Sequence, residues 1–165
     1  MKKSLSAILS IIIVLVFALF AIASSSSDGE KTTQSAGEAQ TAETDSNVGD
    51  YSVEIKDARI TETYDGKAAV VITYGFTNNA ENAVSFSTAF EATPYQGGVG
   101  LNEAFMLRDG DPYTSDNQYK EIKTGATIDV DIAYELNDTE TDIEVEVEEF
   151  LGWTDDKVTK TFTIK

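Results

Sequence analysis

The stretch "AAVVITYGFTNN", residues 68–79, decides the fold class because its side chains alternate between two faces. One face carries large apolar side chains, namely Val70, Ile72, Tyr74 and Phe76. The other face carries smaller or more polar ones, namely Val71, Thr73, Gly75 and Thr77. A period of two that is rich in β-branched and aromatic residues is typical of a half-buried β-strand. The stretch therefore predicts a strand whose large side chains face a core.

Three further segments repeat this alternation toward the C-terminus. The segment "ATIDVDIAYELND", residues 126–138, predicts a strand with Ile128, Val130, Ile132, Tyr134 and Leu136 facing inward. The segment "DIEVEVEEF", residues 142–150, predicts a strand with Ile143, Val145 and Val147 facing inward. Its phase slips before Phe150, which predicts a bulge or a strand end. The segment "VTKTFTIK", residues 158–165, predicts a last strand with Phe162 and Ile164 inward.

Turn residues separate these runs in the manner of an antiparallel sheet. Asp65-Gly66 predicts a type I′ hairpin turn, because this dipeptide accepts positive φ angles. Further turn signals occur at residues 77–82, 96–98, 123–126 and 137–142. No amphipathic helix is expected after residue 30. About seven or eight strands with short connections predict an all-β antiparallel sandwich, and a barrel of similar strand number is the alternative.

Length and charge restrict the functions to consider. A chain of 165 residues has room for one domain. Its 29 acidic and 12 basic residues give a formal net charge of −17. Such a surface repels nucleic acid and anionic lipid, since binding either requires Lys and Arg to displace counterions. A DNA or RNA partner is therefore not expected.

The chain has no Cys and no His. Zinc, copper, haem and iron–sulfur sites depend on thiolate, imidazole or thioether ligands, so these cofactors are not expected. Ser–His and Cys–His nucleophilic catalysis is excluded for the same reason. Carboxylate chemistry remains open, either as hard-cation binding or as a glycosidase-type acid pair. We expect no cofactor and no enzyme activity.

The N-terminus has the features of an export signal. Lys2 and Lys3 precede a segment, residues 4–27, that carries no charge, and residues 21–23 form the small-x-small sequence Ala-Ile-Ala. This predicts cleavage between Ala23 and Ser24. The alternative is an uncleaved anchor, because the apolar run approaches the roughly 20 residues that span a bilayer. Either way the rest of the chain is expected outside the cell, secreted or held at the membrane by this segment alone.

Residues 24–50 are expected to be a disordered linker. They are rich in Ser, Thr, Gly, Ala, Gln and acids, with Val48 as the only larger aliphatic residue. Such a segment buries too little apolar surface to offset the entropy of ordering. The predicted domains are thus a leader or anchor at residues 1–23, this linker, and a folded domain at residues 51–165.

The folded part resembles a known family. The segments that carry the resemblance are "VVITYGFTNNAENAVSFSTAF" (residues 70–90), "YQGGVGL" (95–101) and "YKEIKTGATIDVDIAYELND" (119–138). They resemble an uncharacterised family of secreted or lipid-anchored proteins of Gram-positive Firmicutes, a domain of unknown function with an immunoglobulin-like fold. The wider fold group is similar to a secreted mycobacterial immunoglobulin-like antigen. The resemblance implies an immunoglobulin-like β-sandwich and no catalytic residues.

One position departs from that family. Relatives commonly carry a lipid-modified cysteine between the apolar run and the Ser-rich tether, and Ser24 occupies this position here. A hydroxyl cannot carry the thioether-linked lipid. The chain is therefore not expected to be lipid-modified.

The acidic segment "RDGDPYTSDNQYKE", residues 108–121, is the candidate metal site. Calcium takes six to eight oxygen ligands, and a loop can turn several inward. The candidate ligands are Asp109, Asp111, Asp116 and Glu121. The spacing is not that of an EF-hand, and Asp-Gly and Asp-Pro are also ordinary turn formers, so a solvated turn is the competing interpretation.

Two other groups of residues are candidates for surface roles. Tyr95, Tyr113 and Trp153 lie near predicted turns, where aromatic side chains contact a ligand or close the end of a sandwich. The glutamates of "EVEVEE", residues 144–149, are typical of the solvent face of an edge strand, where charge prevents aggregation.

These observations predict an exported, non-catalytic binding or accessory module of the Gram-positive envelope. Its partner would be an envelope protein or a cell-wall ligand contacted through its loops. Two alternatives from other classes are a small carboxylate-dependent cell-wall hydrolase and a calcium-dependent adhesion or scaffold module.

Overall fold

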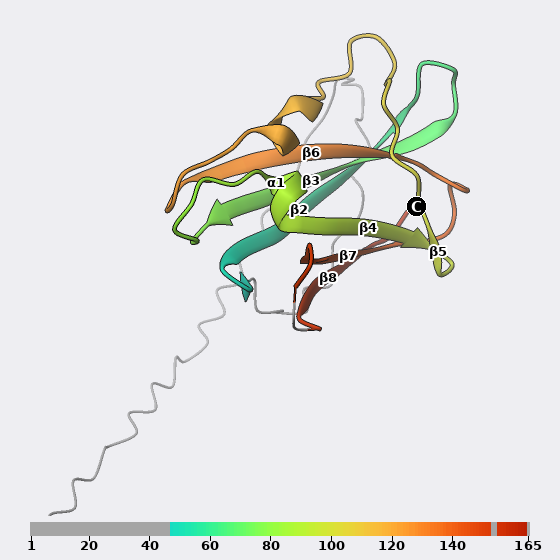
Figure 1. Cartoon of the computed structure of the whole chain (residues 1–165). Coiled ribbons are helices and arrows are strands. Elements are labelled where there is room, and N and C mark those ends of the chain that lie inside the picture. Colours follow the sequence, from blue (N-terminus) through green and yellow to red (C-terminus); the bar gives the residue numbers. More distant parts are fainter. Residues whose placement is uncertain (1–46, 153–154, 165) are drawn as a thin grey trace, which may run out of the picture. The chain divides into compact units, whose positions relative to one another are not determined.

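A computed structural model describes residues 47–152 and 155–164, and within them eight strands form two antiparallel four-stranded sheets (Figure 1). The first sheet has the order β1-β2-β3-β6 and the second the order β5-β4-β7-β8. The strands are β1 (Asn47–Val48), β2 (Tyr51–Glu62), β3 (Ala68–Asn78), β4 (Phe90–Gln96), β5 (Val99–Gly100), β6 (Thr127–Glu135), β7 (Ile143–Glu149) and β8 (Lys157–Phe162). The predicted all-β antiparallel sandwich is confirmed. The predicted leader and most of the linker, residues 1–46, lie outside the described residues.

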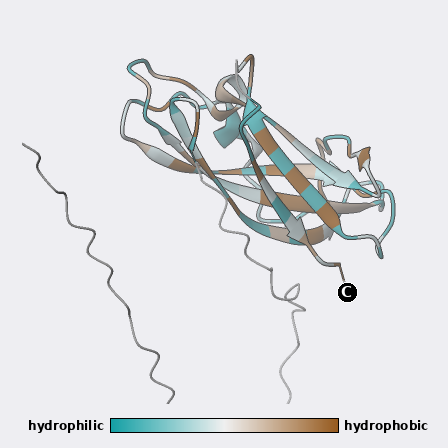
Figure 2. Ribbon diagram, turned by 90° about the horizontal axis from the view of Figure 1, so that it is seen from below, coloured by the Kyte–Doolittle hydropathy of each residue, from teal (hydrophilic) through white to brown (hydrophobic). Residues whose placement is uncertain are grey.

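Strand β3 lies between β2 and β6 and provides the centre of the core. All four of its predicted inward side chains are completely buried, namely Val70, Ile72, Tyr74 and Phe76. The ring of Phe76 contacts those of Phe86 and Phe90 edge-on, at centroid distances of 5.9 and 5.7 Å. Figure 2 shows hydrophobic and hydrophilic residues alternating along the strands. The core therefore fills the space between the sheets from alternate positions of each strand.

The inward faces of β6 and β7 are also as predicted, apart from the strand ends. Val130, Ile132, Tyr134, Ile143, Val145 and Val147 are buried. Strand β7 ends at Glu149, and the next residue, Phe150, is exposed, which confirms the predicted strand end. The edge-strand interpretation of the glutamates is wrong, because β7 pairs with both β4 and β8. Glu144 and Glu148 instead lie exposed on the outer face of a central strand.

The β2–β3 hairpin forms where Asp65-Gly66 predicts it, but its turn is not type I′. A type I′ turn requires a positive φ at both central residues, whereas only Gly66, at φ 82°, has one here. The turn is wider, because the Thr63 N–H donates to the Lys67 carbonyl and the Gly66 N–H to the Thr63 carbonyl. The Thr63 hydroxyl accepts the Lys67 N–H at 3.0 Å and donates to the Asp65 carboxylate. A two-glycine turn with φ of 57° and 79°, at Gly97 and Gly98, joins β4 to β5 instead.

Two short helices were not predicted. They are α1 (Phe86–Ala89) and the 3-10 helix η1 (Ser115–Tyr119). Each is about one turn long, too short to produce a helical period in the sequence. Within residues 47–152 and 155–164, no helix is long and apolar enough to cross a bilayer.

The fold begins earlier than the sequence indicates. Val48, assigned to the linker by composition, is buried in the core, and β1 pairs with the start of β2. This end of the sandwich, where the described chain enters, also contains Phe150 and is called the entry end. The β2–β3 turn marks the hairpin end. The two are separated by the 12 residues of β2, or about 36 Å at roughly 3.3 Å per residue.

Candidate binding sites

The acidic loop is fastened to the outer face of β2 through Asp111. Arg59 donates to both Asp111 carboxylate oxygens, at 2.8 and 2.6 Å, and the Thr61 hydroxyl donates to one of them. These hydrogen bonds, first of all those from Arg59, hold the pKa of Asp111 below its usual value. Asp111 therefore serves to anchor the loop.

The other predicted calcium ligands do not gather around Asp111. Asp109, Asp116 and Glu121 are all exposed. Among the described residues, no group of three or more acidic side chains could hold a metal ion. The calcium site stays a prediction without geometric support in this part of the chain.

The predicted contact aromatics take different positions. The half-buried Tyr113 packs against a small cluster with Val71 and Ala104, and its hydroxyl accepts the Ala133 N–H at 3.3 Å. Burial raises the pKa of Tyr113. Tyr95 lies within β4, opposite the exposed Glu144, and is half-buried. Trp153 and the predicted cleavage site at Ala23 and Ser24 lie outside the described residues.

The most exposed aromatic and apolar side chains at the hairpin end are ones that the sequence did not single out. Tyr64 is 70% exposed, Phe105 80% and Met106 70%. We call these three residues the hairpin-end cluster. Tyr64 lies in the β2–β3 turn, and the other two come from the loop beside it (Figure 1).

Backbone pairing brings two members of the hairpin-end cluster, Tyr64 and Met106, together, and Phe105 precedes Met106 in the same loop. The Tyr64 N–H donates to the Met106 carbonyl at 3.0 Å. Thr63 pairs with Leu107 in the same short antiparallel ladder, and Thr63 is buried. Because neighbouring residues of an extended chain face opposite sides, Tyr64 and Met106 are turned outward together.

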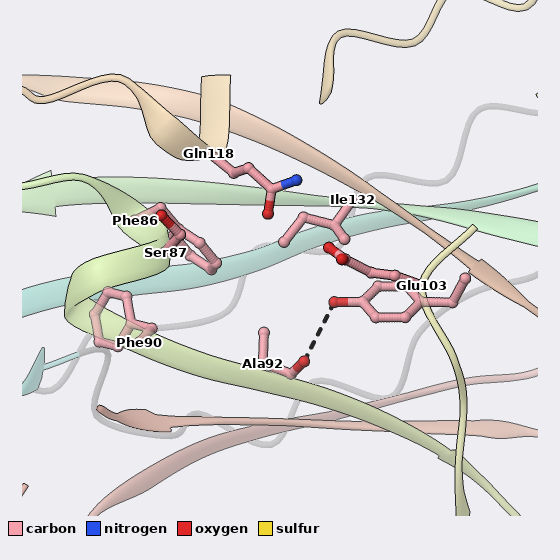
Figure 3. A pocket seen from close by; sticks show the side chains of 8 residues that line it. Phe86, Ser87, Phe90, Ala92, Glu103, Gln118 and Ile132 are labelled. Carbon is pink, nitrogen blue, oxygen red and sulfur yellow. Dashed lines mark hydrogen bonds between the residues drawn. The ribbon is translucent and has the colours of Figure 1, made fainter. Parts of the chain in front are cut away.

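A cavity of about 160 Å³ opens between the two sheets on the side of β4 and β6 (Figure 3). It exists because β5 pairs only with Tyr95 and Gln96, which leaves the first part of β4 without a neighbour on that side. Helices α1 and η1 and the loop after β5 partly cover the gap. The lining residues are Phe86, Ser87, Phe90, Ala92, Glu103, Gln118, Ile132 and Tyr134.

Three polar side chains converge on this cavity (Figure 3). Gln118 is only 7% exposed, and no hydrogen bond to its side-chain amide occurs among the described residues. Glu103 is half-buried and forms no ion pair within the same part of the chain. The Tyr134 hydroxyl donates to the Ala92 carbonyl at 3.2 Å, and its oxygen lies 3.5 Å from the Tyr74 hydroxyl, from which it accepts a hydrogen bond.

The hydroxyl of Tyr134 is held in its neutral form. Burial raises its pKa well above the usual value, with further contributions from Tyr74 and Glu103. Tyr134 was predicted only as a core residue, and Glu103 and Gln118 carried no signal in the sequence. The three come from β6, the loop after β5 and η1, so only the fold brings them together.

Comparisons with known proteins agree with this architecture. A family model described as "Domain of unknown function (DUF5067)" matches residues 25–149, more than half of the chain. A solved structure described as that of a "putative lipoprotein" from Staphylococcus aureus subsp. aureus NCTC 8325 is similar, with a TM-score of 0.56 and 22% identity. The match covers 77% of this chain and 92% of that one. At this identity the likeness shows the fold. No curated protein matches the chain.

Proposed function

The chain belongs to the DUF5067 family of domains of unknown function, and we propose that it is a non-catalytic binding module displayed outside a Gram-positive cell. The export features of residues 2–27 support this location. The description of its structural neighbour from Staphylococcus aureus is consistent with an envelope protein. An immunoglobulin-like sandwich that follows a Ser- and Thr-rich segment is a common form for such a module.

The hairpin-end cluster is the observation that carries the proposal. Its three side chains, Tyr64, Phe105 and Met106, are 70–80% exposed and project from the end opposite to the point where the chain enters the sandwich. Exposed aromatic and Met side chains that gather on one surface are typical of protein interaction sites. A module held by its N-terminal segment would present this end to its partner.

Three acids of the described part have a lowered pKa. Hydrogen bonds lower the pKa of Asp65, Asp111 and Asp138, which anchors the turns and the loop that contain them. A carboxylate hydrolase needs one acid with a raised pKa to protonate the leaving group, so none of these three suits that role.

Site-specific photo-crosslinking on living cells tests the proposal. A photoreactive phenylalanine analogue replaces Phe105 at the hairpin end or, in a matched control, Leu151 near the entry end, which is 82% exposed. We expect a discrete adduct with one envelope protein from position 105 that does not form from position 151. The same adducts from both positions, or none from position 105, would rule out the hairpin end as the recognition surface.

A further inference from the structure

We propose that the cavity between β4 and β6 binds a primary alkylammonium group, such as the side chain of a lysine or the end of a free diamine. This site is separate from the hairpin-end cluster and does not depend on the function proposed above. The argument rests on the three polar groups that face the cavity and on the apolar surface beside them (Figure 3).

Gln118 is one of the polar groups that a ligand in this cavity would meet. Its side chain is more than nine-tenths buried, points into the cavity and has no partner in the described part of the chain. Among the described residues, every side-chain nitrogen or oxygen that is fully shielded from solvent has a hydrogen-bond partner, so the Gln118 amide atoms keep access to solvent. The amide is therefore available to a polar group that enters the cavity.

Glu103 determines the charge of the ligand. It is the one charged residue in the lining, and it forms no ion pair with any described residue. Its backbone pairs with that of Tyr134, and the two side chains line the same cavity. A half-buried carboxylate attracts a cation more strongly than one in open water, because the surrounding dielectric constant is lower.

The number of acceptors fits an ammonium group. An alkylammonium has three N–H donors and no acceptor. The two carboxylate oxygens of Glu103 and the carbonyl oxygen of the Gln118 amide offer three acceptors, and the Tyr134 hydroxyl oxygen, already paired with Tyr74, has one further lone pair. A guanidinium is planar and needs five acceptors, which this lining does not supply.

The apolar lining fits a short hydrocarbon stem. The rings of Phe86 and Phe90 and the side chain of Ile132 form the rest of the wall. The cavity, about 160 Å³, resembles in size the cavities of roughly 150 Å³ that accept a benzene molecule. A four-carbon stem with a terminal nitrogen has a similar number of heavy atoms. Exposed Ser87 lies at the rim, where a ligand enters.

Titration of the intact chain with matched probes tests the proposal. Nα-acetyl-lysine amide carries the ammonium, Nα-acetyl-norleucine amide has nearly the same stem without it, and 1,5-diaminopentane represents a free diamine. Calorimetry in about 0.15 M salt limits non-specific attraction to the acidic surface. We expect at least one amine to bind at least tenfold more tightly than the norleucine compound. Comparing the two amines identifies the source of the ammonium group.

Two variants separate the site from the general charge of the protein. Glu103→Gln removes the cavity carboxylate, and Glu91→Gln removes an exposed carboxylate of β4 outside the lining, so both change the net charge equally. We expect the first to weaken amine binding at least tenfold and the second to change it less than twofold. In NMR spectra the side-chain NH₂ signals of Gln118 should shift upon amine binding.

The proposal is overturned if neither amine binds more tightly than the norleucine compound, or if both variants weaken binding equally. Perturbations spread over the acidic surface, with none at Gln118, would also overturn it. A photo-crosslinking failure at Phe105 would leave this result unaffected, so the two proposals fail separately.

Discussion

The sandwich buries two glutamines, and within the described residues the side-chain amide of one is hydrogen-bonded to the protein and that of the other is not. Gln96, at the end of β4, is 3% exposed, and Gln118, in η1, is 7% exposed. The Gln96 amide donates to the carbonyls of Asp138 and Thr141 at 3.1 and 2.9 Å and accepts the Asn137 N–H at 2.8 Å. The Gln118 amide has no such partner among the described residues and faces a cavity.

The difference separates a structural role from a candidate binding role. The Gln96 amide bonds the backbone of the β6–β7 connection, as a neighbouring strand would. Its hydrogen-bonding groups therefore all have partners within the fold. The side-chain amide of Gln118 can still form hydrogen bonds with a ligand. The burial of a polar residue therefore does not by itself indicate a function, and its hydrogen-bond partners have to be considered.

Replacing Gln96 should have the largest effect on stability. Gln96→Leu leaves the 137–141 connection without its three main hydrogen bonds, and we expect a loss of about 2–3 kcal/mol in the free energy of unfolding. Urea denaturation followed by circular dichroism measures it. A loss below about 0.5 kcal/mol would mean that solvent satisfies these backbone groups and that Gln96 does not hold the connection.

Asp111, like Gln96, has its hydrogen-bond partners within the protein, but its side chain is charged. Asp111→Asn should cost about 1–2 kcal/mol near neutral pH, a modest value because the Arg59 side chain is partly exposed and solvent screens the pair. Asp109→Asn, an exposed neighbour in the same loop, serves as the control and should change stability by less than about 0.5 kcal/mol.

The loss of stability caused by Asp111→Asn should become smaller as the pH falls. The pKa of Asp111 is lower in the folded protein than its usual 3.8, so the unfolded chain takes up the proton first. The stabilisation is thus fully present above about pH 4 and is lost as pH falls through the folded pKa. Urea curves should show the gap between wild type and variant closing below pH 4. A gap of constant size would contradict the role of the carboxylate charge.

Gln118→Leu should have the smallest effect on the free energy of unfolding. It is the direct counterpart of Gln96→Leu. No side-chain hydrogen bond between described residues is lost, and the new side chain lines the same cavity as Phe86 and Ile132. We expect stability to stay unchanged or to rise by up to about 1 kcal/mol. A destabilisation as large as that of Gln96→Leu would mean that the amide holds the fold together, and the two glutamines would then belong to one class.

The sequence predicted what depends on neighbouring residues and missed what depends on distant ones. The alternation around Tyr74 was sufficient to assign the strand, its buried face and the sandwich. The partners of Gln96 and Asp111 are 42 and 52 residues away in the chain, and no local pattern connects them. In the sequence, Asp111 is therefore one of several acids in the loop, and its pairing with Arg59 becomes evident only in the fold.

The candidate sites were missed for the same physical reason. Tyr64 and Met106 become neighbours only when a loop pairs with the β2–β3 turn. Their segments lack the alternation that reveals strands, because their side chains face solvent at the end of the sandwich.

The two-residue strand β1 has a mechanical consequence. It pairs with β2 through Asn47–Ser52 and Val48–Tyr51, on either side of a tight turn. Because β1 contributes only two pairs and β2–β3 contributes eleven, we expect tension on the chain before Asn47 to open the β1–β2 pairs first. Residues 47–50 then span up to about 14 Å at roughly 3.5 Å per residue, so the chain lengthens by less than this before the β2–β3 ladder is loaded.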